Sequence, residues 1–193
     1  SISLGLLYNE GEQSTNIHIS NNTFKDADGV NINSSKNVRI HGNLAYGEQY
    51  FVQPIKMMYV NGLEITQNTI YKSFNTINLM MCEGTQEEPI IIANNFISGK
   101  EDVLQLLANK HILFAHNSVF GNHGSVLVRN NGNEDSRFLN NIFYQNHTSG
   151  SLFFIHNLEQ QPEVFDYNCL YSNGHYGVDA TVPGMSYLDY DAY

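Results

Sequence analysis

The sequence has few basic residues and no long apolar run. Nine lysines and arginines stand against 19 aspartates and glutamates, which gives a formal net charge of −10. This balance argues against nucleic acid and against anionic membrane surfaces as partners. No apolar stretch reaches the ~20 residues of a membrane-spanning helix. The motifs of zinc proteases, serine hydrolases and nucleotide-binding loops are also missing, so any site must come from the way the chain is organised.

One pattern, I-x-I-x-x-N-x-F, recurs along the chain with apolar residues at its first, third and last places. It occurs seven times, at Ile17–Phe24, Val38–Ala45, Leu63–Ile70, Ile90–Ile97, Ile112–Val119 and, more loosely, Ser136–Phe143 and Glu163–Leu170. Successive asparagines are 21, 25, 27, 22, 24 and 27 residues apart. A pattern that returns every 20 to 50 residues is typical of a solenoid.

The remainder of each repeat distinguishes between kinds of solenoid. Leucine-rich repeats carry a similar asparagine but need a leucine three residues upstream, where this chain has Ser14, Ser35, Val60 and Glu87. The second half of each repeat alternates with period two, as in Val126–Arg129, which predicts a strand. Each repeat therefore reads as strand, asparagine corner, short strand, polar loop, strand and polar loop. We predict an all-β fold, a right-handed parallel β-helix of about seven rungs plus a partial N-terminal rung.

The seven repeats resemble the rungs of the pectate-lyase-like superfamily of right-handed parallel β-helices, over roughly residues 1–175. That superfamily contains lyases, hydrolases, epimerases, phage tailspikes and adhesins, so the resemblance implies a fold and a link to carbohydrate rather than one activity. The motifs of its polygalacturonase-like hydrolases are absent, apart from a partial G-H-G at Gly121–Gly124. Val128–Asn133 is faintly similar to the L-R-H-G-N-R run of its alginate and chondroitin lyases, without the histidine and the second arginine.

The recurring asparagines are predicted to form a buried ladder at the corner between two strands. A corner leaves backbone groups without partners, and an asparagine side chain offers both a donor and an acceptor to satisfy them. Rungs stack at ~4.8 Å. The predicted ladder consists of Asn22, Asn43, Asn68, Asn95, Asn117, Asn141 and Asn168.

The β-helix is expected to span residues 1–182, with residues 183–193 as a tail or the start of a cap. Ser1–Leu7 reads as the last strand of a rung, which favours a longer solenoid or a covering chain at this end. Cys82 and Cys169 fall on rungs three and seven, ~19 Å apart by the rung spacing. A disulfide needs Cα atoms within ~7 Å, so we expect both thiols to be free.

The outward positions of the first strand can be followed from rung to rung. Arg39 and Glu64 are expected to pair on neighbouring rungs. Further along, Ile91, Leu113 and Leu139 form an apolar patch that another segment or subunit could cover.

Loops after the short strand should stack into a wall that carries carboxylates. Asp28, Glu48 and Asp102 are the candidate catalytic residues, because glycosidases use two carboxyl groups ~5 Å or ~6.5–9.5 Å apart. Glu48 lies one rung from Asp28 and two from Asp102, so it could pair with either. Solvated loop acids without a role are the alternative interpretation.

Five further residues are candidates for substrate binding: Tyr46, Tyr50, Asn75, His123 and His147. The preferred hypothesis is a polysaccharide-processing protein, with a glycoside hydrolase favoured over a polysaccharide lyase because carboxylates outnumber basic groups in the wall. A non-catalytic glycan-binding or adhesin solenoid is the alternative, and whether the chain is an enzyme stays open. We expect no metal and no cofactor, a secreted or cell-surface location of bacterial type, and any signal peptide upstream of Ser1.

Overall fold

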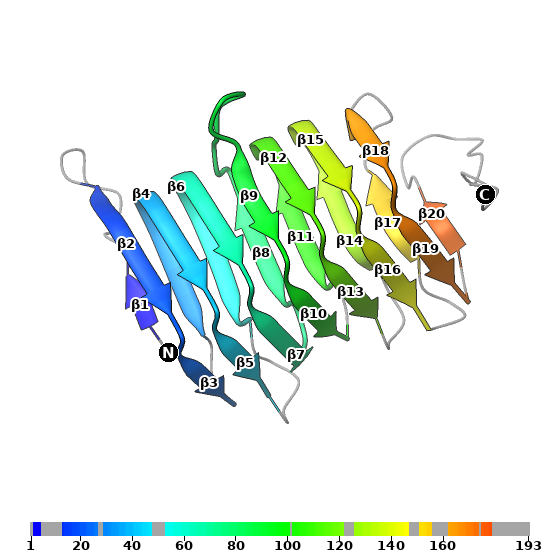
Figure 1. Cartoon of the computed structure of the whole chain (residues 1–193), viewed down its shortest axis with the longest axis horizontal. Coiled ribbons are helices and arrows are strands. Elements are labelled where there is room, and N and C mark those ends of the chain that lie inside the picture. Colours follow the sequence, from blue (N-terminus) through cyan, green and yellow to red (C-terminus); the bar gives the residue numbers. More distant parts are fainter. Residues whose placement is uncertain are drawn as a thin grey trace.

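The computed structural model describes residues 2–4, 13–26, 29–47, 53–100, 102–121, 126–146, 151–155, 162–173 and 175–178. Regular structure in these residues is entirely β-strand, stacked in one row between the two ends of the molecule (Figure 1). A 13-stranded and a 7-stranded sheet are formed, and their strands pair in parallel. The prediction of an all-β parallel β-helix is therefore confirmed.

Each rung contributes a strand to each of three faces. Face 1 contains β2 (Ser14–Ser20), the second halves of β4 (Val30–His41) and β6 (Ile55–Thr66), β9 (Ile90–Ala93), β12 (Lys110–Ala115), β15 (Glu134–Leu139) and β18 (Val164–Asp166). Face 2 contains β3 (Thr23–Lys25), β5 (Leu44–Tyr46), β7 (Thr69–Ser73), β10 (Phe96–Gly99), β13 (Ser118–Gly121), β16 (Ile142–Gln145) and β19 (Cys169–Ser172). Face 3 contains β1 (Ile2–Leu4), the first halves of β4 and β6, β8 (Ile77–Met80), β11 (Leu104–Leu107), β14 (Val126–Asn131), β17 (Ser151–Ile155) and β20 (His175–Val178).

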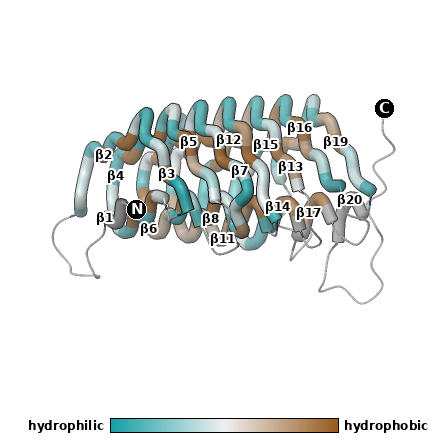
Figure 2. Tube along the Cα trace, turned by 90° about the horizontal axis from the view of Figure 1, so that it is seen from below, coloured by the Kyte–Doolittle hydropathy of each residue, from teal (hydrophilic) through white to brown (hydrophobic). Residues whose placement is uncertain are grey.

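The core is built from files of apolar side chains that run along the solenoid. Alternation along each strand sends every second residue inward. Because the rungs pair in register, one inward file of face 1 consists of Ile19, Ile40, Ile65, Ile92, Phe114 and Phe138. Figure 2 shows hydrophobic positions repeating along the strands and hydrophilic ones returning at the corners. Burial of these files supplies most of the driving force for folding.

The first corner, between faces 1 and 2, carries the predicted asparagine ladder. Asn68 donates from its backbone nitrogen and its side-chain Nδ2 to Asn95 Oδ1, at 2.9 and 3.0 Å. Asn95 makes the same two bonds to Asn117, at 3.0 and 2.9 Å. From Asn43 onward, each side chain also donates to a carbonyl of the preceding rung, as Asn95 does to Ile65 at 2.8 Å. The pattern continues from Asn22 to Asn168, so the ladder is confirmed.

The residue before each ladder asparagine turns the chain with a positive φ. These φ angles lie between 55° and 63° at Asn21, Gly42, Gln67, Asn94, His116, Asn140 and Tyr167. Left-handed geometry costs a non-glycine residue free energy, and the ladder bonds offset that cost.

The second corner, between faces 3 and 1, differs from expectation in part. A polar loop was expected there, and residues 82–88 belong to such a loop between β8 and β9, whereas β4 and β6 run continuously through the corner. A second, shorter ladder lines it: Cys82 N donates to Asn109 Oδ1 at 2.9 Å, and Asn109 N donates to Asn133 Oδ1 at 2.8 Å. Earlier rungs place Ser35 and Val60 in the same buried file. At the corners within β4 and β6 and between β14 and β15, the polar residues expected to form a loop are instead corner residues that need only one or two turn positions.

Candidate functional site

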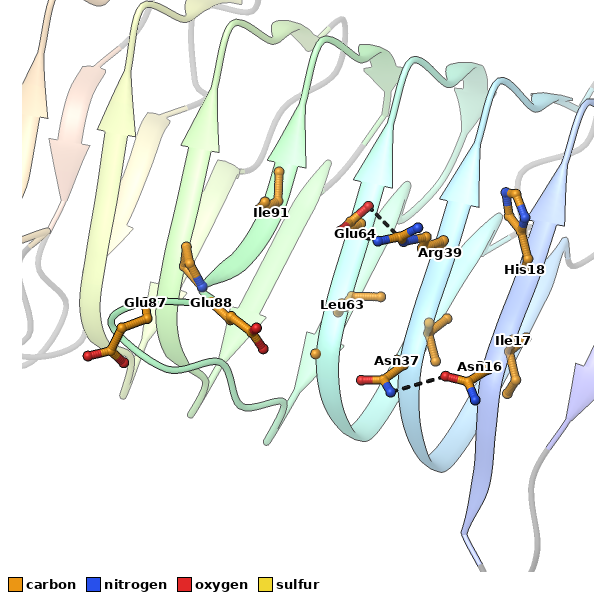
Figure 3. A pocket seen from close by; sticks show the side chains of 13 residues that line it. Asn16, Ile17, His18, Asn37, Arg39, Leu63, Glu64, Glu87, Glu88 and Ile91 are labelled. Atoms are coloured by element: carbon orange, nitrogen blue, oxygen red, sulfur yellow. Dashed lines mark hydrogen bonds and ion pairs between the residues drawn. The ribbon is translucent and has the colours of Figure 1, made fainter.

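A groove lies on the outer surface of face 1, near the N-terminal end. Its volume is about 630 Å³, within the ~300–1,000 Å³ of ligand pockets. Strands β2, β4 and β6 form its floor, and the loop before β9 forms its far wall (Figure 3). In Figure 1 this loop projects beyond the neighbouring strands. The groove is thus made where the connection between β8 and β9 is longer than the connection between β11 and β12 on the next rung.

The polar lining of the groove carries charges of both signs. Arg39 pairs with Glu64 through Nε–Oε2 at 3.1 Å and Nη2–Oε1 at 3.2 Å, as the sequence predicted. His18 lies in the same outward row, one rung away. Glu87 and Glu88 come from the loop, and in Figure 3 Glu88 points toward the strands while Glu87 points away. Carboxylates outnumber the arginine, so the groove favours ligands that donate hydrogen bonds over anionic ligands.

The loop that walls the groove is held by its own hydrogen bonds. Gly84 N donates to Lys110 O at 3.0 Å, which ties the loop to the next rung. Thr85 N donates to Glu88 O, and Glu88 N donates to Thr85 Oγ1, both at 2.9 Å. A Cβ at Gly84 would lie 2.6 Å from Ile90 N, so only glycine fits there. The wall therefore has a defined position relative to the floor.

An acid–base cluster lies further along face 1, toward the C-terminal end. His111 Nδ1 is 2.6 Å from Asp135 Oδ2. Arg137 Nε lies 3.6 Å from Asp135 Oδ1, and Glu163 hydrogen-bonds to Asp135 from the following rung. Register explains this meeting, because His111 is paired with Asp135 and Glu163 N donates to Ser136 O at 2.8 Å. Three rungs thus contribute to one site.

The two carboxyl groups of this cluster have pKa values displaced in opposite directions. Burial alone would raise the pKa of Asp135, but hydrogen bonds with Glu163 and His111 and the positive charge of Arg137 lower it below its usual range. The hydrogen bond to Asp135 and the charge of that carboxylate raise the pKa of Glu163. The two carboxyl groups therefore differ in acidity, with Glu163 the weaker acid of the pair, and such a difference is the starting point for a division into an acid and a base.

The predicted site residues are placed only in part. Asp28, Glu48, Tyr50, His123 and His147 lie outside the described residues, so the predictions for them stand untested.

Asp102 is described, and it is engaged in an ion pair. Its carboxylate accepts from Arg129 Nη2 at 3.0 Å and from Gln105 Nε2 at 3.1 Å. Arg129 is the basic residue of the run that resembles lyase motifs, so its charge is directed at Asp102. Asn75 is half-buried in the turn after β7.

Tyr46 belongs to a row of aromatic side chains on the outer surface of face 2. Its ring stacks on that of Tyr71, with centroids 5.4 Å apart and an interplanar angle of 6°. The ammonium of Lys25 lies 6.0 Å from the centroid of the Tyr46 ring. Further along, Tyr144 stacks on Tyr171 at 4.7 Å. Stacking covers one ring face of Tyr46, and its role as a platform for sugar stays a prediction.

Sequence reasoning missed the His111 cluster and the groove wall. The available signal was Glu163, a charged residue at a frame position that is apolar in most repeats. The groove gave no such signal, because Glu87 and Glu88 looked like ordinary loop acids.

Comparison with known proteins identifies a family. The model of the NosD family, described as periplasmic copper-binding protein, matches residues 6–154, which is more than half of the chain. The chain belongs to the NosD family. No curated protein and no solved structure shows significant similarity to it. The family and the fold agree in the parallel β-helix, and neither supports the hydrolase part of the prediction.

The copper in the family's description can be compared with the side chains of this NosD-family chain. Within the described ranges, no group of three histidine, cysteine, aspartate or glutamate residues is placed to hold a metal ion. Cys82 is free, and burial raises the pKa of its thiol to about 11, so it stays protonated rather than becoming the thiolate that binds metals. Cys169 is also free, as predicted. The soft donors that fit copper are methionine thioethers, and Met58 lies opposite Met80 on neighbouring rungs.

Proposed function

We propose that the chain is an extracytoplasmic β-helix that binds a neutral oligosaccharide segment in the groove on face 1. The observation that supports this most directly is the groove itself, whose floor is made of paired strands and whose lining mixes apolar and charged side chains. The family's periplasmic description supports the location.

The charges of the groove distinguish between classes of glycan. Glu64, Glu87 and Glu88 can accept hydrogen bonds from sugar hydroxyls. The guanidinium of Arg39 is already paired with Glu64, so it is poorly placed to neutralise a uronate. A neutral polysaccharide therefore fits better than an acidic one, which also disfavours the lyase alternative, because β-elimination requires a uronate.

Binding can be tested with the purified chain on panels of neutral and uronate polysaccharides. We expect micromolar to millimolar binding to a neutral glycan, and a loss of at least ~10-fold in affinity for Glu64→Ala and for Glu88→Ala. Glu134→Ala is the matched control, because Glu134 is an exposed glutamate paired with Lys110 outside the groove. Equal affinity of Glu88→Ala and Glu134→Ala would contradict the assignment to the groove.

Glycoside hydrolysis is a second candidate function, and the His111 cluster favours it. Glu163 would act as the acid that protonates the leaving oxygen, while Asp135 orients His111 to accept a proton from water. Asp28, Glu48 and Asp102 are the competing set of carboxylates. Both sets can be compared on the same chain.

Hydrolysis is tested by the release of reducing ends from the glycan that binds. Glu163→Gln should lower turnover at least ~100-fold if the His111 cluster is the site, whereas Glu48→Gln should do so if the loop wall is the site. Binding should survive in both variants. If the unmutated chain binds glycan without any turnover, the result contradicts hydrolysis and supports non-catalytic binding.

A further inference from the structure

The methionines of this chain are concentrated at one place. Four of the five lie in two short segments, at Met57, Met58, Met80 and Met81. These segments are on neighbouring rungs of face 3, in β6 and at the end of β8. Met57 points inward and is fully buried, so it is a core residue. The other three are at least partly exposed.

The three exposed methionines occupy neighbouring outward positions near the second corner. Met58 and Met80 are opposed in register, so their Cα atoms are about 4.8 Å apart, the spacing of paired strands. Met81 follows with a φ of 52°, a left-handed turn that keeps it on the outer side. Met81 is 43% exposed, and the next residue, Cys82, is fully buried. Two consecutive methionines thus face outward beside a third.

The spacing of these side chains suits one shared ion. A metal–sulfur bond is roughly 2.3 Å long, as for zinc, so two sulfurs on one ion lie up to ~4.6 Å apart. Neighbouring rungs provide nearly this separation without movement of the backbone. Methionine has three rotatable side-chain bonds, which allow the sulfurs to adjust their separation to that needed for one ion.

The surroundings of the three methionines select for a soft ion. The positions that flank Met58 and Met80 in their file are Asn33 and Leu107. The nearest charged side chains along the strands are Lys56 and Glu83, and Glu83 pairs with Lys110 at 3.7 Å. Hard cations require several carboxylate or carbonyl oxygens, whereas thioethers prefer monovalent copper.

We propose that Met58, Met80 and Met81 form a binding site for one copper(I) ion held by thioether sulfur. The site lies on face 3, apart from the groove on face 1, and does not depend on glycan binding. The choice of copper agrees with the family's description, while the residues come from register and exposure in this chain.

The test is an anaerobic titration of the full chain with copper(I) in competition with bicinchoninate. We expect one equivalent to be withdrawn from the chelator. Replacing all three methionines by leucine keeps side-chain volume and should weaken copper(I) binding at least ~100-fold. Methyl carbon-13 NMR with silver(I), a redox-inert probe, should shift the signals of Met58, Met80 and Met81 and leave that of Met57 in place.

The controls separate loss of ligands from loss of fold. Met57→Leu removes a buried methionine of the same strand and should leave copper(I) binding unchanged. If the triple variant does not fold, Met81→Leu alone alters the most exposed sulfur and should weaken binding by about 10-fold. Equal affinity of the unmutated and Met81→Leu chains, or failure of the unmutated chain to compete with bicinchoninate, would overturn the proposal. Glycan binding should be the same in all these variants.

Discussion

At both corners of the solenoid, backbone groups need hydrogen-bond partners, and the two corners supply them with different residues. The first corner repeats asparagine from Asn22 to Asn168, with each side chain bonded to the next. At the ladder position of the second corner, asparagine occurs only at Asn109 and Asn133 among the described rungs, and Cys82, Val60 and Ser35 continue the file. The groove, the His111 cluster and the methionines all adjoin the second corner, and none of them adjoins the first.

The reason for this difference lies in what surrounds each corner. In a continuous ladder every asparagine must bond the next one, so an insertion at that corner would break a hydrogen bond. At the second corner the residue two after the ladder position is Asn37, Gly62, Gly84, His111 or Asp135, in one file along the solenoid. This file can carry an insertion at Gly84 or a titratable pair at His111 and Asp135 without breaking an adjacent ladder. Residue type and connection length therefore differ among the rungs at the second corner, where the ladder is short.

Replacing Asn95 by leucine should break the first corner and give the largest effect. The substitution leaves the two donors of Asn68 and the carbonyl of Ile65 without their partner, and it removes one of the two bonds that Asn117 Oδ1 accepts from residue 95. A buried polar group without a partner costs ~1–3 kcal/mol, so we expect the free energy of unfolding to fall by about 3–5 kcal/mol. Urea denaturation followed by circular dichroism measures it. A change below about 1 kcal/mol would show that the ladder is not a source of stability.

The same change at Asn109 should cost less and so sharpen the comparison. Asn109 accepts one bond from the rung before it, from Cys82 N, whereas Asn95 accepts two. We expect a loss of about 2–3 kcal/mol in the same denaturation assay. Equal losses at Asn95 and Asn109 would mean that the two corners do not differ energetically.

The His111 cluster should give the second corner a smaller, pH-dependent effect. The pKa of Asp135 is lowered on folding, so its contribution to stability is present above its unfolded pKa and is lost as the pH falls through its folded pKa. The pKa of Glu163 is raised, so its contribution is present in acid and is lost as the pH rises through its folded pKa. Glu163→Gln should remove the second dependence.

Carboxyl carbon-13 NMR checks this titration directly. We expect Asp135 to titrate below its usual range and Glu163 above it, with the two curves coupled. In Glu163→Gln, the curve of Asp135 should become a single step. Two independent titrations at ordinary values would contradict the contact between the carboxyl groups.

Cys82→Val should have the smallest effect. Val60 already occupies the preceding position of the same buried file, and the thiol of Cys82 contacts the backbone of Val60 and lies 3.5 Å from Met80 O. We expect a change of less than about 1 kcal/mol in the free energy of unfolding. A large loss would show that the cysteine sulfur has a specific role in this file, and the comparison with the first corner would have to be revised.

The sequence by itself determined the solenoid and its first corner. Period-two alternation and a recurring asparagine are properties of each repeat, and they act between equivalent positions of neighbouring rungs. The ladder from Asn22 to Asn168, the outward pair of Arg39 and Glu64 and the two free cysteines could therefore be predicted without coordinates. Alternation also predicted which residues point into the core.

The tertiary structure alone decided where different parts of the repeats meet. Contact between Glu163 and Asp135 depends on the height at which the seventh rung begins, and the pairing of Arg129 with Asp102 depends on the turn before β11. The groove exists because the loop ending at Pro89 is anchored at Gly84 and reaches over face 1. The repeats differ in length, so the position of a loop relative to its neighbours depends on how all the preceding rungs stack. The sequence of a single repeat does not contain that information.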